Sequence, residues 1–110
     1  MEHLDYETLN TLRQVMEEDF DLLIDTFIQD SSDRIVKLRE VVGGTEADPI
    51  RRAAHSFKGS SSNIGALRLT TLCHALEKKA MSNNLEQLDQ DLLEIEQEFA
   101  QVQELLRTLA

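Results

Sequence analysis

The sequence has few of the residues that build irregular, disulfide-stapled or membrane-spanning structures. Its 110 residues include one cysteine, one proline, four glycines and no tryptophan. A single cysteine excludes an internal disulfide. With so few prolines and glycines, the chain has few residues that favour tight turns. No apolar run approaches the roughly 20 residues that span a bilayer, and the start, MEHLDYETL, lacks the apolar stretch of a secretory signal. We therefore expect a cytoplasmic protein with no membrane contact.

Positive charge is also scarce. Eleven Lys and Arg residues stand against 21 Asp and Glu residues, which gives a formal net charge of −10. Because nucleic-acid affinity comes mainly from Lys and Arg on phosphates, no nucleic-acid partner is expected. The apolar content of 41% is that of a globular chain. The length predicts one domain over residues 1–110 with a single core, and we expect a monomer.

Apolar residues recur at helical spacing in five segments, and β-branched residues never alternate over a long run. The segments are approximately Asp5 to Met16, Asp19 to Val42, Asp48 to Asn63, Ala66 to Met81, and from just after Asn84 to the end of the chain. Asp5 and Asp48 are the expected N-caps of the first and third helices, with Pro49 at the first helical position. Gln87 is placed to complete a capping box in the fifth helix. The prediction is an all-α, antiparallel four-helix bundle with an additional short N-terminal helix.

The stretch AAHSFKGSSSNIGA, at residues 53–66, places a glycine and three consecutive serines inside the third helix, where they lower helix stability. Gly costs about 1 kcal/mol relative to Ala in a helix interior. On a helical wheel of about 100° per residue, His55 lies roughly 150° from the middle of the core-facing arc. His55 is therefore predicted to face solvent. The residues of that arc are Ile50, Ala53, Ala54, Phe57, Ser61 and Ile64.

Two features distinguish the surface around His55 from an ordinary helix face. Gly59 lies one turn away on the exposed side, where core packing demands no glycine, so it clears space beside the imidazole. Residues 50–76 contain four cations and no acid, in a chain that is otherwise strongly anionic. The arrangement suits an anion at His55. The cations are Arg51, Arg52, Lys58 and Arg68, and the neighbours within about 60° on the wheel are Arg51, Lys58, Gly59 and Ser62.

The remaining chemically active residues form no second constellation in the sequence. His3 and His74 have no metal-ligand spacing to each other or to the third histidine, so neither a metal nor a cofactor is expected. Cys73, on the buried face of the fourth helix, is interpreted as a core thiol. Glu77 and Lys78 follow on the same helix, and a solvated surface pair is the favoured interpretation.

The string HSFKGSSSNIGA resembles the signature of histidine-phosphotransfer (HPt) domains of bacterial two-component phosphorelays. In that signature a histidine is followed by Lys at i+3, Gly at i+4, small residues, and a Gly-Ala pair about ten residues on. The number and lengths of the predicted helices fit the same family, so the resemblance covers almost the whole chain. The matching residues are His55, Lys58, Gly59, Ser60, Ser61, Gly65 and Ala66.

The resemblance implies a phosphorelay intermediate. His55 would accept a phosphoryl group from a receiver-domain aspartate and pass it to another receiver, with Lys58 stabilising the phosphate. The partners would be receiver domains of response regulators, a hybrid histidine kinase, or both. The surface expected to meet them consists of Gly59, Arg51, Arg52 and Ser62.

Two other functions compete with this one. A helical-bundle adaptor could bind a signalling partner through the His55 face without phosphotransfer; acid-labile phosphate on His55 would separate the two. An autokinase is rejected, because the chain has no Gly-rich nucleotide box and no room for an ATP-binding domain.

Overall fold

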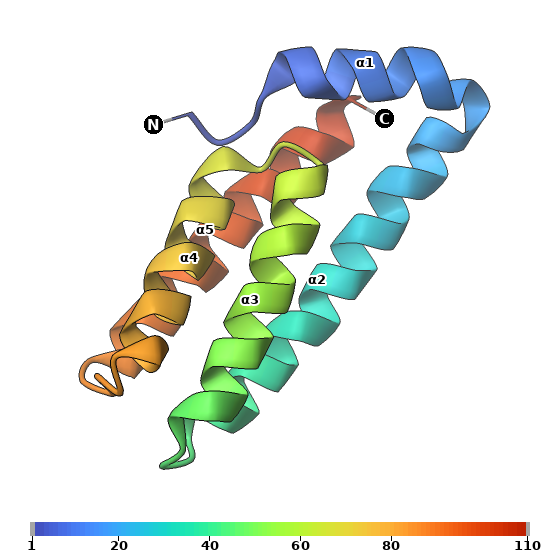
Figure 1. The fold of residues 1–110 in the computed structure, drawn as a ribbon. Helices are drawn as coiled ribbons and strands as arrows, with labels where there is room; N and C mark the ends of the chain where they lie inside the picture. The colour runs from blue at the N-terminus through green and yellow to red at the C-terminus, as the bar shows by residue number, and fades with distance from the viewer. Residues whose placement is uncertain (1, 110) are drawn as a thin grey trace.

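The computed structural model describes residues 2–109, which form five α-helices joined by short connections (Figure 1). The helices are α1 (Tyr6–Met16), α2 (Phe20–Val42), α3 (Ala47–Asn63), α4 (Leu67–Met81) and α5 (Leu88–Leu109), with a 3-10 turn at Glu17–Asp19. Helices α2 to α5 run antiparallel, and α1 lies across one end of them. This is the predicted four-helix bundle with its additional N-terminal helix. Within residues 2–109, no helix is both long and apolar enough to cross a membrane.

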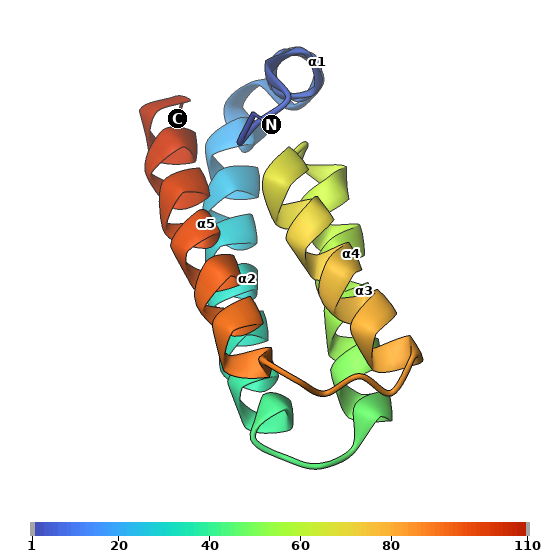
Figure 2. The same ribbon diagram turned by 90° about the vertical axis from the view of Figure 1, so that its left-hand side faces the viewer.

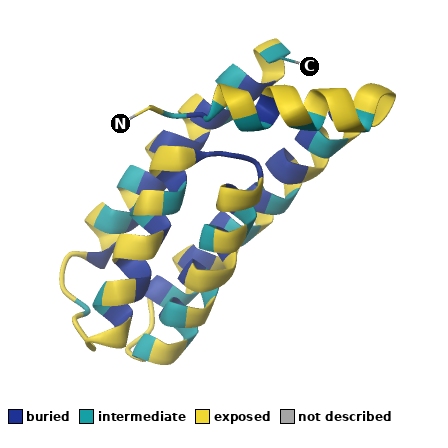
Figure 3. Cartoon of the chain, turned by 45° about the horizontal axis from the view of Figure 1, so that its top comes forward, coloured by how far each residue is buried: buried dark blue, intermediate teal, exposed yellow. Residues whose placement is uncertain are grey.

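The four long helices pack as a ring around one core. Helix α3 contacts α2 and α4, and α5 contacts the same two helices from the other side (Figure 2). Buried residues line the inner faces, while exposed residues cover the outside (Figure 3). Burying a large apolar side chain contributes about 1.5–3 kcal/mol, so the core accounts for most of the helical stability. Among the least exposed large side chains are Leu4, Leu9, Ile24, Leu38, Ile50, Phe57, Leu69, Leu76, Ile95 and Leu106.

The N-terminus of α3 differs from the prediction. The helix begins at Ala47 with Glu46 as its N-cap, so Asp48 is not the cap and Pro49 is not the first helical residue. Pro49 still lies in the first turn, where a backbone N–H has no partner within the helix. The Asp48 carboxylate is thereby free to pair with arginines one turn later.

The start of α5 also differs from the prediction. The helix begins at Leu88, and Gln87 precedes it in a left-handed conformation (φ +58°), so no capping box forms. The side chain of Asn84 instead accepts a hydrogen bond from the backbone N–H of Glu86, within the α4–α5 connection. Leu85 packs against the core from this connection and not from the helix. Leu85 therefore continues the apolar spacing of α5 although it lies outside the helix.

A close backbone approach joins the N-terminal segment to the turn between α3 and α4. The N–H of Asp5 donates to the carbonyl of Gly65 (2.8 Å), and the N–H of Leu67 donates to the carbonyl of His3 (3.0 Å). Gly65 has φ +78°. A Cβ built there would lie 3.2 Å from the Cβ of Asp5 and 3.3 Å from that of Thr8. Gly65, in the turn that follows α3, therefore serves as the docking point for the segment before α1.

Replacing Gly65 with alanine is expected to destabilise the fold by about 1–2 kcal/mol, the cost of left-handed backbone for a residue with a Cβ. The tight contacts with Asp5 and Thr8 add to that cost. The melting temperature, followed by circular dichroism, should fall by about 4 °C for each kcal/mol. Gly59→Ala is the matched control, since nothing lies within 4 Å of its added Cβ and helix propensity predicts a small rise. Equal shifts in both variants would contradict the proposed role of Gly65.

Candidate functional site

His55 projects from the middle of α3 into solvent, as the helical wheel predicts. Its side chain is 62% exposed, whereas Ala54 and Phe57 on the same helix are fully buried. Ser61 is also fully buried, which confirms its expected place in the core. Periodicity alone places the imidazole on the surface, because α3 has one apolar face and that face fixes the rotation of the helix.

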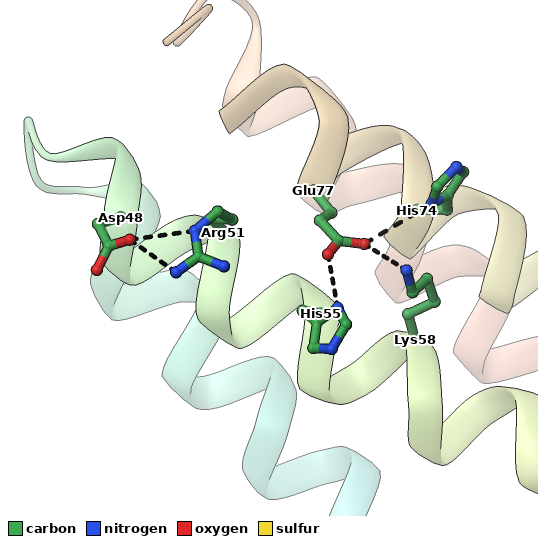
Figure 4. Close-up of polar contacts among 6 residues, drawn as sticks. All are labelled: Asp48, Arg51, His55, Lys58, His74 and Glu77. Carbon is green, nitrogen blue, oxygen red and sulfur yellow. Dashed lines mark hydrogen bonds and ion pairs between the residues drawn. The ribbon is translucent and has the colours of Figure 1, made fainter. Parts of the chain in front are cut away.

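A buried carboxylate on the neighbouring helix holds the imidazole. Nδ1 of His55 lies 2.6 Å from Oε2 of Glu77 on α4, whose side chain is only 9% exposed (Figure 4). An ionised carboxylate can only accept hydrogen bonds, so Nδ1 carries the proton and donates it. In the neutral ring Nε2 then holds the lone pair, and Figure 4 shows that Nε2 points away from Glu77. The tautomer and the orientation of the ring are both fixed by this contact.

The interpretation of Glu77 and Lys78 as a solvated surface pair is wrong for Glu77. Glu77 lies at the seam between α3 and α4, and its other oxygen, Oε1, is 2.6 Å from Nζ of Lys58. Lys78 is exposed. The sequence signal that could have identified Glu77 is its spacing, since it follows Leu76 and Cys73 on the buried face of α4 and carries a charge there. A buried acid needs a partner, and His55 and Lys58 supply it.

Glu77 is ionised at neutral pH. The hydrogen bond from Lys58 is the largest cause that lowers the pKa of this carboxyl, and the hydrogen bond from His55 lowers it further. Burial acts in the opposite direction and is outweighed. His74, one turn before Glu77, places its Nδ1 3.7 Å from Oε1 at the edge of the cluster. The group at the surface is therefore an imidazole backed by a fixed negative charge.

Arg51 and Arg52 lie beside the histidine, but their charges are partly compensated. Nη2 of Arg51 is 2.9 Å from Oδ1 of Asp48, and Nε of Arg52 is 3.0 Å from Oδ2 of the same carboxylate. The acid-free stretch, residues 50–76, is thus flanked by two acids, Asp48 and Glu77, and both pair with its cations. The positive patch on the surface is smaller than the linear sequence suggests.

Gly59 and Ser62 lie on the exposed side of α3. A Cβ added at Gly59 would meet no atom within 4 Å, so packing inside this molecule does not require the glycine. Ser62 lines a shallow hollow with Thr70 and Thr71 of α4. Cys73 is fully buried, and burial raises the pKa of its thiol to about 12, which agrees with a core thiol. No group of three or more metal-ligating side chains gathers within residues 2–109.

Most of the chain matches one protein family. The model of that family, described as the Hpt domain, matches residues 22–109. This chain belongs to the Hpt domain family. As a family member it is a histidine-phosphotransfer intermediate that exchanges phosphoryl groups with receiver domains, and the proteins of this family are phosphocarriers. The function expected from the sequence is thereby confirmed at the level of the family.

A solved Hpt protein has the same architecture. The crystal structure of histidine-containing phosphotransfer protein B (HptB) from Pseudomonas aeruginosa PAO1 superposes with a TM-score of 0.93 and shares 39% sequence identity. The match covers 96% of this chain and 92% of that one. No curated protein matches the chain.

Proposed function

We propose that Nε2 of His55 accepts the phosphoryl group from a receiver-domain aspartyl phosphate and returns it to a second receiver. The observation that carries this assignment is the exposed imidazole whose Nδ1 is held by the buried, ionised Glu77. Neutral imidazole is a competent nucleophile near pH 7. A pure adaptor surface would need neither a fixed tautomer nor a buried carboxylate behind the ring.

The transfer balances without further groups from this chain. The Nε2 lone pair of His55 forms the nitrogen–phosphorus bond while the phosphorus–oxygen bond of the aspartyl phosphate breaks, and the receiver's carboxylate leaves. The product ring carries the phosphoryl group on Nε2 and the proton on Nδ1, so it gains positive charge. Glu77 compensates that charge at 2.6 Å. The reverse step regenerates the neutral ring for the next cycle.

Lys58 can bind the phosphoryl group while it remains paired with Glu77. An ammonium group has three N–H donors, and the ion pair with Glu77 engages one of them. The others remain for phosphoryl oxygens, and the contact with Glu77 places Lys58 beside the ring. Holding the cation in advance removes part of the reorganisation that transfer would otherwise require.

Exposure of His55 on a convex helix face suits docking of a folded partner. Gly59 leaves open space one turn after the ring, Arg51 and Arg52 lie about one turn before it, and Ser62 lies about two turns after it on α3. We assign these four residues to partner contact. The net charge of −10 supports a cytoplasmic monomer with no nucleic-acid partner, and the absence of a Gly-rich nucleotide box in the sequence supports transfer without autokinase activity.

The proposed acceptor is tested by mixing the protein with a phosphorylated receiver and mapping acid-labile phosphate to a peptide. Phosphate on the peptide that contains His55 supports the assignment. Stable binding of the receiver without phosphate transfer would favour the adaptor. A profile against every receiver domain of the source organism would then identify the partners.

Replacing Lys58 with alanine is expected to slow transfer roughly ten- to a thousandfold. The loss corresponds to about 1–4 kcal/mol for a unit charge about 4 Å from the phosphoryl oxygens. Single-turnover kinetics with a phosphorylated receiver measure it. Lys78→Ala, which removes an exposed lysine from α4, is the control and should leave the rate unchanged. Equal rates for the two variants would mean that Lys58 contributes only surface charge and does not assist the transfer.

Replacing Glu77 separates its charge from its hydrogen bond. Glu77→Gln keeps an oxygen that accepts from Nδ1 but removes the negative charge, and transfer should slow by about tenfold. Glu77→Ala removes both and should slow transfer further. Single-turnover rates at matched receiver concentration rank wild type, Gln and Ala in that order. A Gln variant as slow as the Ala variant would mean that the charge, and not the ring orientation, is the whole contribution.

A further inference from the structure

A second histidine in this protein has the same kind of surroundings as His55. Nδ1 of His3 lies 2.7 Å from Oε2 of Glu98 on α5. The other oxygen of Glu98, Oε1, lies 3.4 Å from Nε of Arg68 on α4. The Glu98 side chain is 4% exposed, and the His3 side chain is 40% exposed. An imidazole at the surface, a buried carboxylate behind Nδ1, and a cation on the second carboxylate oxygen thus occur together twice.

The chemistry of the ring follows from the same argument at both sites. Glu98, paired with Arg68, can only accept hydrogen bonds as a carboxylate, so Nδ1 of His3 carries the proton. In the neutral ring Nε2 then holds the lone pair. The contact with Glu98 is made through Nδ1 and leaves Nε2 on the other side of the ring.

The backbone holds His3 in place although it precedes the first helix. Its carbonyl accepts a hydrogen bond from the N–H of Leu67, and the N–H of Asp5 donates to Gly65. Leu4, between them, is fully buried. His3 is therefore anchored on both sides and does not lie on a free tail.

A hollow lies against one side of the same cluster. It has a volume of about 420 Å³ and borders the Arg68–Glu98 pair, while His3 contacts the other oxygen of Glu98 from outside the lining. Five of its six lining residues are polar, and the lining comes from α4 and α5: Arg68, Glu94, Gln97, Glu98, Ala100 and Gln101. Arg68 offers further N–H donors to phosphoryl oxygens beside the contact that it makes with Glu98.

We propose that His3 is a second phosphoacceptor, which takes phosphoryl groups from small nitrogen-linked donors of the phosphoramidate class. The Nε2 lone pair of His3 forms the new nitrogen–phosphorus bond while the phosphorus–nitrogen bond of the donor breaks. The amino group of zwitterionic phosphoramidate is already protonated, so it leaves as ammonia. The positive charge that develops on the ring is compensated by Glu98, as Glu77 compensates it at His55. The inference does not depend on the proposed role of His55.

Reaction at His3 is expected to be slower than at His55, on the order of tenfold. Its ring is less exposed, 40% against 62%. Its cation lies farther from the carboxylate, 3.4 Å against 2.6 Å. His3 also lies beside the α3–α4 turn, about 12 Å along α3 from His55 at 1.5 Å per residue. A receiver seated on His55 therefore has its phosphoryl group away from His3, and small donors are the reagents that reach it.

The test uses phosphoramidate as the probe and His55→Gln as the parent protein. The chain has three histidines, so two double variants complete the set. His55→Gln should take up acid-labile phosphate roughly tenfold more slowly than wild type, with the label mapped by mass spectrometry to His3. His55→Gln with His74→Gln should behave like the parent, and His55→Gln with His3→Gln should take up none. Arg68→Gln in the parent should slow the labelling further.

Two results would overturn the proposal. One is a His55→Gln protein that takes up no phosphate. The His3–Glu98–Arg68 cluster would then only hold the N-terminal segment on the bundle. The other is a label that maps to His74. Because mapping is done on the parent, in which His3 is intact, a folding defect in the His3 variant does not affect the outcome.

Discussion

His55→Gln is expected to abolish phosphoryl transfer from a phosphorylated receiver while the helical fold stays intact. The imidazole is 62% exposed and contributes little to the core, so circular dichroism and the melting temperature should change little. Glutamine can still donate to Glu77 but has no nucleophilic nitrogen, and the rate should fall below detection. A radiolabel transfer assay with a phosphorylated receiver measures it.

His74→Gln is the matched control for this variant. His74 is also exposed on the same seam and also lies near Glu77, at 3.7 Å, but its ring is not held by a short hydrogen bond. Transfer to the His74 variant should remain within a few fold of wild type. Label retained from the receiver on His55→Gln would remove His55 from the mechanism.

Gly59→Gln is expected to stabilise the protein and impair transfer from a receiver. Glutamine has a better helix propensity than glycine by up to about 1 kcal/mol, which corresponds to a melting rise of a few degrees. The structure removes the competing explanation that packing inside the molecule requires the glycine, because an added Cβ meets nothing within 4 Å. The longer side chain would instead stand one turn from His55, where a receiver must approach.

Comparing a phosphorylated receiver with phosphoramidate shows whether Gly59 affects docking of the receiver or the reaction at His55. Transfer from a receiver should slow, while phosphoramidate should still label the peptide that contains His55 at the wild-type rate. Gly59→Ala serves as the control, since it gains helix propensity with little added bulk and should keep most receiver transfer. Normal receiver transfer to the Gln variant would mean that the glycine has no role in docking. Equal loss with both donors would mean that it acts on His55 itself.

The helices could be predicted because their signal is local. Apolar spacing in α2 and the N-cap at Asp5 depend on residues a few positions apart, and both match the structure. The errors at the helix ends are local as well and occur where two signals compete. At α3 the Asp48–Pro49 pair predicts a helix start, but the helix begins one residue earlier, at Ala47, with Glu46 as its N-cap.

The sequence by itself determined the helical bundle, the place of His55 on the exposed face of α3 and, through the HSFKGSSSNIGA string, the family to which the chain belongs. One apolar face fixes the rotation of one helix, and that is enough to place an exposed residue.

Only the tertiary structure decided what stands behind the imidazole. His55 and Glu77 are 22 residues apart on different helices, and His3 and Glu98 are 95 residues apart. Helix periodicity shows which way a side chain points from its own axis, but not which residue of the neighbouring helix lies at the same height. That register is set by the packing of α3 on α4, and of the N-terminal segment on α4 and α5. The buried carboxylates that fix the two rings could therefore be recognised only once the helices were placed together.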